Sequence, residues 1–196
     1  MLKLKLAAAA TVIVTLAAGT HTVRAEFYNP DARYFWSYGS YQQQYTPGRS
    51  PIQRAVTRAP GGYGPNTIVI STSQRRLYYV GSNGQAISYG IGVGRAGFTW
   101  SGQTRVSAKK AWPGWTPPAQ MRRRQPGLPS HMAGGINNPL GARALYLGSS
   151  LYRIHGSNEP ETIGRAVSSG CFRMTNEDVI DLYNRVAVGT KVIVLR

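Results

Sequence analysis

The sequence predicts a β-rich α+β domain over residues 64–196. Three features support this prediction: short apolar β-type runs recur after Asn66, Asn83-Gly84 marks a tight hairpin turn, and a single helical stripe follows Cys171. Of the 196 residues, 42% are hydrophobic, which is enough apolar material for one core. A domain of about 130 residues buries around two-thirds of the surface that its unfolded chain exposes.

The strands of this domain are predicted from apolar runs and turn residues. Asn83 and Gly84 supply the positive φ angles that a two-residue hairpin turn requires, and a second hairpin is expected around residues 148–150. Residues 112–142 hold six of the twelve prolines, so we expect a long irregular excursion of the kind that often covers a site. The expected strands are 67–70, 76–80, 85–89, 104–108, 144–147, 151–154 and 191–195.

One helix is expected after Cys171. Thr175 is placed to cap its N-terminus, with Asp178 three residues later as a variant of the capping box. The helical apolar stripe that follows ends before Gly189. Its members are Val179, Ile180, Leu182, Tyr183 and Val186.

The first 25 residues have the pattern of a secretory signal peptide. Two lysines precede a 13-residue apolar run at 6–18, and Val23-Arg24-Ala25 supplies a cleavage site after Ala25. The run is shorter than the roughly 20 residues of a membrane span. We therefore expect export, to the periplasm of a Gram-negative cell, with an uncleaved N-terminal anchor as the alternative.

Residues 26–63 are expected to form a flexible linker. They are rich in Tyr, Gln, Pro, Gly and Arg, and no helical or strand period persists in them. The change of pattern near Asn66 marks the start of the folded domain.

The charge is strongly positive and unevenly distributed. Lys and Arg number 23 against 7 Asp and Glu, a net charge of +16, which becomes +13 once the three cations of residues 1–25 are removed. No acidic residue lies between Asp31 and Glu159, and Arg122-Arg123-Arg124 is the densest basic run. Outside the cytoplasm such a surface would concentrate cell-wall polymer, lipopolysaccharide or acidic lipid; a solvated basic face is the alternative. Nucleic acid is not expected, because export and the scattered basic pattern oppose it.

His155 and Cys171 are the candidate catalytic residues. Cys171 is the only cysteine, which excludes an intramolecular disulfide framework, and with three histidines no structural metal site is expected. It lies in a polar Ser-Ser-Gly segment, where Arg173 and the approaching helix N-terminus would favour the thiolate; a packed, inert thiol is the alternative. A nucleophilic cysteine needs a base, which His155 could supply from the end of a predicted strand, with His131 as the alternative base.

These residues resemble the signature of the YkuD-type L,D-transpeptidases. That signature is His, about fifteen residues, then Ser/Thr-His-Gly-Cys and commonly an Arg two residues on. It is matched here by His155, by Ser-Ser-Gly-Cys at residues 168–171 and by Arg173. The resemblance covers about residues 64–196. Further matches are Asn138–Gly141, Ile154–Gly156, Ile163–Gly164 and Val188–Val192.

The resemblance implies a fold and a reaction. The fold would be a YkuD-like β-sandwich or barrel with one main helix after the cysteine loop. The Cys171 thiolate would attack the bond between diaminopimelate and the terminal D-Ala of a peptidoglycan stem peptide. The resulting thioester would pass to an amine of a second stem, giving a 3→3 cross-link. His155 would be the base, oriented by the backbone carbonyl of Gly156, and no cofactor or metal would take part.

The resemblance also implies roles for the residues around the thiol. The backbone N–H groups of Gly170 and Cys171 would bind the oxyanion. Ser168, Ser169 and Arg173 would contact the substrate, although Arg173 can equally support the cysteine loop. The family commonly has a histidine where this chain has Ser169, which can form a hydrogen bond but carries no charge.

The acceptor of the thioester stays open. Water would make the protein an L,D-carboxypeptidase, and the amine of an outer-membrane protein would make it an anchoring ligase. The alternative from another class is a non-catalytic cell-wall-binding module. A papain-like thiol protease is disfavoured, because in those enzymes the cysteine precedes the histidine.

Overall fold

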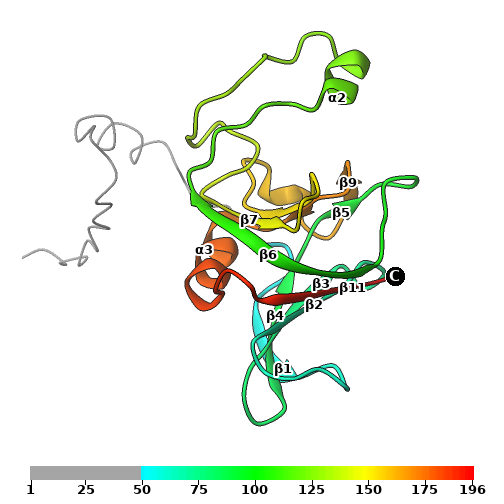
Figure 1. Ribbon diagram of the computed structural model, residues 1–196, viewed down its shortest axis with the longest axis vertical. Helices are drawn as coiled ribbons and strands as arrows, with labels where there is room; N and C mark the ends of the chain where they lie inside the picture. Colours follow the sequence, from blue (N-terminus) through cyan, green and yellow to red (C-terminus); the bar gives the residue numbers. More distant parts are fainter. Residues whose placement is uncertain (1–49) are drawn as a thin grey trace, which may run out of the picture. The chain divides into compact units, whose positions relative to one another are not determined.

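The computed structural model describes residues 50–196 (Figure 1). The expected signal peptide, residues 1–25, and residues 26–49 of the expected linker lie outside the described residues. Strands make up most of the regular structure, and the one long helix of the described part, α3 (Asn176–Arg185), follows Cys171. The β-rich α+β class is therefore confirmed.

Nine of the described strands form one continuous sheet. Its order is β1-β4-β3-β2-β11-β6-β7-β8-β10, while β5 (Val93–Gly94) pairs with β9 (Ala166–Ser168). Within the large sheet neighbours are antiparallel, except that β2 with β11 and β8 with β10 are parallel; β5 and β9 are also parallel. The strands of the large sheet are β1 (Ala55–Arg58), β2 (Thr67–Ser71), β3 (Arg76–Val80), β4 (Gln85–Gly90), β6 (Gly102–Ala111), β7 (Arg143–Leu147), β8 (Arg153–His155), β10 (Phe172–Arg173) and β11 (Lys191–Leu195).

Strand β6 joins the two halves of this sheet. Its residues up to Arg105 pair with β11, and those from Val106 onwards pair with β7. The register shifts between Val106 and Ala108, as at a β-bulge that bends a strand. Among the described residues β1 and β10 end the sheet without pairing to each other, so the barrel allowed by the resemblance does not close.

Local sequence signals predicted the tight turns and the helix start correctly. Strands β3 and β4 pair antiparallel, with Asn83 at φ 59° and Gly84 at φ 70° in their turn. Strands β7 and β8 form the second expected hairpin. The Thr175 hydroxyl oxygen accepts a hydrogen bond from the N–H of Asp178 at 3.3 Å, which caps α3.

The excursion at residues 112–142 is closed at its base. The Trp112 N–H donates to the Ala142 carbonyl at 2.8 Å, and Trp115 and Met132 exchange backbone hydrogen bonds of 2.8 and 2.7 Å. The sequence predicted no helix there, but the excursion contains α2 (Ala119–Arg124), which has no buried residue. Figure 1 shows α2 at the far end of the excursion, away from the large sheet.

The core lies on the sheet face that α3 covers. Helix α3 contributes Val179 and Leu182, and it packs against β7 and β8. At the C-terminal end of α3, the carbonyls of Tyr183 and Val186 accept hydrogen bonds from the Lys109 ammonium at 2.7 and 2.5 Å. A cation is stabilised there because the C-terminal end of a helix carries partial negative charge. The largest fully buried side chains include Tyr89, Phe172, Ile68, Ile70, Leu77 and Ile154.

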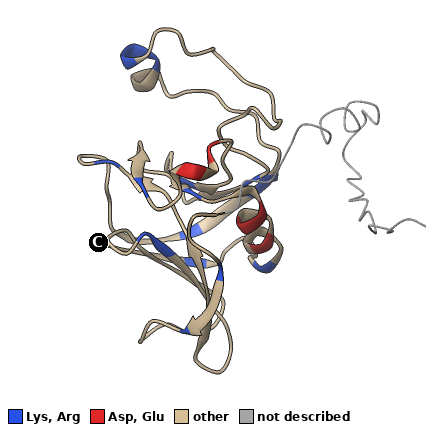
Figure 2. Cartoon of the chain, turned by 180° about the vertical axis from the view of Figure 1, so that it is seen from behind, with Lys and Arg blue, Asp and Glu red and all other residues tan. Residues whose placement is uncertain are grey.

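The charges of the described chain are segregated. Figure 2 shows its acidic residues on α3 and around the short helix η1 (Pro160–Thr162), whereas Lys and Arg are spread over the remaining elements. No helix of the described part is long and apolar enough to cross a membrane.

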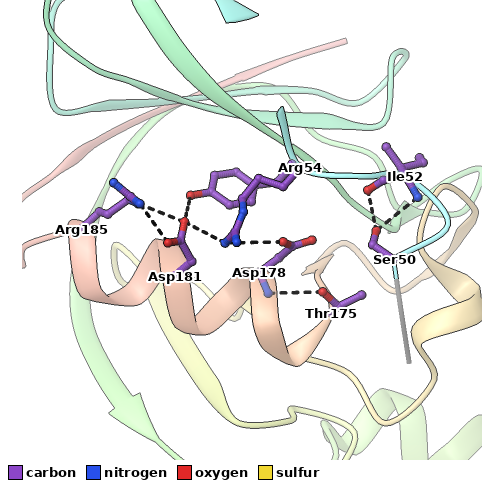
Figure 3. A network of polar contacts seen from close by, with 8 residues as sticks. Ser50, Ile52, Arg54, Thr175, Asp178, Asp181 and Arg185 are labelled. Atoms are coloured by element: carbon purple, nitrogen blue, oxygen red, sulfur yellow. Dashed lines mark hydrogen bonds and ion pairs between the residues drawn. The ribbon is translucent and has the colours of Figure 1, made fainter. Parts of the chain in front are cut away.

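The N-terminal end of the described chain is packed onto the domain. Strand β1 pairs with β4, although it falls inside the predicted linker 26–63, so that prediction needs correction at its C-terminal end. The Arg54 guanidinium lies 3.1 Å from the Asp181 carboxylate and 3.9 Å from that of Asp178, both on α3 (Figure 3). Ile52 lies so close to two glycines of the domain that neither could carry a Cβ without displacing it. These contacts join residues distant in sequence, which is why local composition did not indicate them.

Candidate active site

The pairing of β8 with β10 brings the two predicted catalytic residues onto one face. The register matches Ile154 with Phe172, so Cys171, immediately before β10, lies beside Arg153. Ile154 and Phe172 both point into the core. Because successive side chains of a strand point to opposite faces, Arg153, His155 and Cys171 lie together on the other face.

His155 is buried and held in one orientation. The residue is 4% exposed, and its Nδ1 lies 2.6 Å from the backbone carbonyl oxygen of Gly156. A carbonyl oxygen only accepts hydrogen bonds, so Nδ1 carries the proton and Nε2 of the neutral ring keeps a free lone pair. Burial, together with the positive charges of Arg173 and Arg153, lowers the pKa of His155 to about 3. The imidazole is therefore neutral and able to accept a proton near neutral pH.

Gly156 is required by packing as well as by its carbonyl. A Cβ on Gly156 would lie 2.2 Å from Oδ1 of Asn176, the first residue of α3. That same oxygen accepts a hydrogen bond of 2.8 Å from the N–H of Ala142. Helix α3, the end of the excursion and the carbonyl that orients His155 are thus fixed to one another through Asn176.

Cys171 is a half-buried free thiol. Its Sγ donates a weak hydrogen bond to the carbonyl oxygen of Leu151 at 3.7 Å. Burial raises the pKa of Cys171, and the nearby Arg153 opposes that shift. The expectation that Arg173 and the helix N-terminus would favour the thiolate is therefore outweighed by desolvation. At rest the site holds a neutral thiol and a neutral imidazole.

The loop before Cys171 is held by Ser168. Its buried hydroxyl donates to the carbonyl of Cys171 at 2.6 Å and accepts from the N–H of Gly170 at 3.1 Å. Ser168 is thus occupied inside the loop rather than presented to a ligand, and the N–H of Gly170 already has a partner. Among the described loop and turn contacts the N–H of Cys171 donates no backbone hydrogen bond, so of the two predicted oxyanion donors it is the one without such a partner. Ser169 is partly exposed beside them.

The family model for the YkuD L,D-transpeptidase catalytic domain matches residues 65–194. The chain belongs to this family. The resemblance seen in the sequence is therefore confirmed.

Several relatives share this domain. A probable L,D-transpeptidase of Escherichia coli K12, YbiS, is 44% identical over 64% of this chain and 43% of its own length. Another from the same organism, YcfS, is 38% identical over 72% of this chain and 46% of its own length. The matched region therefore spans less than half of each of these relatives.

Solved structures share the fold. A Brucella melitensis protein described as a probable carnitine operon oxidoreductase is 44% identical over 75% of this chain and 96% of its own, with a TM-score of 0.51. An L,D-transpeptidase of Mycobacterium smegmatis is 19% identical over 66% of this chain and 58% of its own, also with a TM-score of 0.51. The second match shows the shared fold alone.

In this L,D-transpeptidase domain Arg173 is engaged within the loop region. Its guanidinium lies 2.8 Å from the Glu159 carboxylate, and its backbone exchanges two hydrogen bonds of 2.9 Å with Gly92. Of the two roles expected for Arg173, these contacts favour support of the cysteine loop over contact with a substrate. His131, the alternative base, is exposed in the excursion, where its Nδ1 lies 3.0 Å from the Thr116 hydroxyl.

An aromatic wall beside the cysteine was not predicted from the sequence. The Trp100 ring stacks on Tyr152 with centroids 4.8 Å apart, and the indole N–H donates to the carbonyl of Gly170 at 3.1 Å. A Cβ on Gly170, which has φ 107°, would lie 2.5 Å from the Tyr152 ring. Gly170 therefore allows the loop to approach this wall. No local pattern around Trp100 indicates the contact.

Arg153 is a second group beside the cysteine that was not predicted from the sequence. It precedes His155 by two residues in β8, so the alternation of a strand places both side chains on one face. That alternation can be read from the sequence. The proximity of Arg153 to Cys171 cannot, because it depends on the parallel pairing of β8 with the two-residue strand β10.

Proposed function

We propose that this chain is an exported peptidoglycan L,D-transpeptidase with Cys171 as nucleophile and His155 as base. The observation that supports the proposal is the parallel pairing of β8 with β10, which brings the segments that carry His155 and Cys171 side by side, with the imidazole oriented by the Gly156 carbonyl. Membership of the L,D-transpeptidase family supplies the substrate class, the stem peptides of the cell wall. The proposed location is the periplasm, after cleavage of residues 1–25.

In the acylation step, Cys171 Sγ attacks the carbonyl carbon between diaminopimelate and the terminal D-Ala. Nε2 of His155 takes the thiol proton as the S–C bond forms, which is general-base catalysis by the neutral ring. The carbonyl oxygen becomes an oxyanion and accepts a hydrogen bond from the N–H of Cys171. When the C–N bond breaks, His155 returns the proton to the leaving amine, and D-Ala departs.

In the second step, an amine of another diaminopimelate attacks the thioester carbonyl. His155 removes a proton from the attacking nitrogen and delivers it to the sulfur as the C–S bond breaks. The products are a 3→3 cross-link and the original thiol. A water molecule or an amine of an outer-membrane protein, entering in place of this amine, would give trimming or protein attachment through the same steps.

The basic surface supports an anionic substrate. Stem peptides carry several carboxylates, and the described chain has no acidic residue before Glu159. Uncompensated cations raise the local concentration of such a polymer, and arginine can bind a carboxylate with two parallel hydrogen bonds.

Mass spectrometry of purified tetrapeptide stems incubated with the mature protein tests the proposal. We expect loss of D-Ala, an acyl adduct on the protein and a 3→3 cross-linked dimer. The Cys171→Ala variant, with its fold checked by circular dichroism, should give none of these. Tripeptide without dimer would identify water as the acceptor. An unchanged tetrapeptide with wild-type protein would contradict the proposal and favour a wall-binding module.

A further inference from the structure

Arg153 is the charged side chain placed next to Cys171 by the sheet. Strand β8 begins at Arg153 and β10 begins at Phe172, and because Ile154 is matched with Phe172, Cys171 immediately before β10 comes beside Arg153. Both side chains lie on the face opposite the core.

The two side chains also share a hydrogen-bond acceptor. The carbonyl oxygen of Leu151 accepts from Nη1 of Arg153 at 3.1 Å and from Sγ of Cys171 at 3.7 Å. The guanidinium and the thiol therefore converge on one oxygen atom. Nε of Arg153 is buried and has no hydrogen-bond partner among the described residues. A buried guanidinium N–H without an acceptor costs free energy. Its position beside the thiol therefore indicates that a hydrogen-bond acceptor forms there during the reaction.

The positive charge of Arg153 is not neutralised by a carboxylate. None of the ion pairs found in the described chain includes Arg153, whereas Arg173 on the same face is paired with Glu159 at 2.8 Å. The Arg153 guanidinium lies instead 5.0 Å from the centre of the Tyr146 ring, with Lys110 5.9 Å from the same ring. An aromatic face fixes the position of a cation without cancelling its charge.

We propose that Arg153 is the cationic partner of the Cys171 thiolate. Once the proton has left, Sγ can no longer donate to the Leu151 carbonyl, whose lone pairs then repel the anionic sulfur. The unpartnered Nε–H of Arg153 offers the sulfur a charge-assisted hydrogen bond in exchange. The same contact stabilises the negative charge that develops on the sulfur as the C–S bond of the thioester breaks, before His155 delivers the proton. This inference rests on the proposed function, in which Cys171 is the nucleophile.

Other charged groups around the thiol do not replace Arg153. His155 is neutral, as its lowered pKa indicates, and Arg173 is bound to Glu159. Arg95 and Arg124 are held by another ring, with their guanidinium groups 4.4 and 5.3 Å from the centre of Phe98. Against the effect of burial, the pKa of Cys171 is lowered first by a hydrogen bond from the backbone of Arg153 and then by the charge of its guanidinium, ahead of the charge of Arg173.

The test is the pH dependence of Cys171 alkylation by iodoacetamide in the full chain, compared among wild type, Arg153→Met, Arg153→Lys and Lys110→Met. Arg153→Met should raise the apparent pKa of the thiol by about one unit or more, which slows alkylation roughly tenfold at pH values below that pKa. Arg153→Lys should recover at least half of the shift, because it retains a charge over Tyr146. Lys110→Met, which removes the other cation over the same ring, should leave the profile within about twofold of wild type.

The inference is overturned if the profiles of Arg153→Met and wild type coincide, or if Lys110→Met shifts the profile as much. Melting curves show which variants are folded, and should Arg153→Met not fold, Arg153→Gln and Arg153→Lys decide the question. Iodoacetamide is small and uncharged, so the measurement does not need a stem-peptide site. A shifted profile in a protein that leaves tetrapeptide unchanged would refute the proposed function while upholding the role of Arg153.

Discussion

The buried, neutral state of His155 makes a specific prediction about the pH dependence of acylation. Burial lowers the pKa of His155 to about 3, whereas an ordinary histidine titrates near 6.5. At pH 5 an ordinary imidazole would be neutral in only about 3% of molecules, so a base of that kind would lose roughly 30-fold in rate between pH 8 and pH 5. With the lowered pKa, about 99% of His155 remains neutral at pH 5.

The assay is the second-order rate constant for acylation of Cys171 by a carbapenem, followed by mass spectrometry of the protein from pH 5 to pH 8. We expect changes of less than about threefold and no inflection near pH 6.5. A sigmoidal loss of roughly 30-fold centred on that pH would refute the reasoning, because it would mean that His155 gains its proton at the ordinary pKa.

The same burial should appear in the stability of the protein. Since the pKa is lowered on folding, the unfolded chain binds a proton at this residue below about pH 6.5, while the native state does not until about pH 3. Stability is therefore full above pH 6.5 and falls as the pH drops towards 3, with a contribution of about 2 kcal/mol lost at pH 5. His155→Gln has no group that titrates here. In urea titrations the fall in the free energy of unfolding between pH 8 and pH 5 should therefore be about 2 kcal/mol larger for the wild type than for His155→Gln.

Four further predictions concern the loop, the N-terminal contact and the charge. His155→Ala should slow acylation by a carbapenem on the order of 10²–10⁴-fold, because the general base is lost. Ser169→Ala should slow it by only about two- to twelve-fold, which corresponds to one neutral hydrogen bond. Equal losses for the two variants would make Ser169 a catalytic residue. Ser168→Ala leaves the N–H of Gly170 without its acceptor and should cost about 1–3 kcal/mol in urea unfolding, together with slower acylation than Ser169→Ala. Arg54→Met removes the ion pairs to α3 and should lower the free energy of unfolding by about 1 kcal/mol. The loss is small because the Arg54 side chain is 43% exposed and solvent screens its ion pairs; an unchanged urea midpoint would show that these ion pairs do not stabilise the fold. Binding to peptidoglycan sacculi should weaken as salt rises, since exposed charges are screened over about 8 Å at physiological ionic strength; salt-independent retention in a pull-down would contradict it.

The features predicted correctly are those that short stretches of chain determine. The turn at Asn83-Gly84 follows from the φ angles that these residues tolerate, and the start of α3 follows from the side chain of Thr175. The spacing of His155 and Cys171 indicated the family without knowledge of how the loop closes.

The features that were missed depend on long-range pairing and burial. Strand β1 forms because Ala55–Arg58 finds β4 as a partner, not because of its own composition. Arg153 lies beside Cys171 only through the parallel pairing of β8 with β10. The ionisation of the thiol was expected to follow the neighbouring charges, but desolvation outweighs them, and desolvation is a property of the folded site.

The basic surface is organised by aromatic rings as well as by carboxylates. All five acidic residues of the described chain lie between Glu159 and Asp181, so cations elsewhere have no carboxylate nearby in sequence. Three rings of the described part each hold two cations within 6 Å: Phe98 holds Arg95 and Arg124, Tyr146 holds Lys110 and Arg153, and Tyr183 holds Lys109 and Arg143. An ion pair would fix a cation and neutralise it, whereas a ring fixes it and leaves its charge available. The chain thereby keeps ordered, uncompensated positive charge, both at the thiol through Arg153 and on the surface that would meet an anionic polymer.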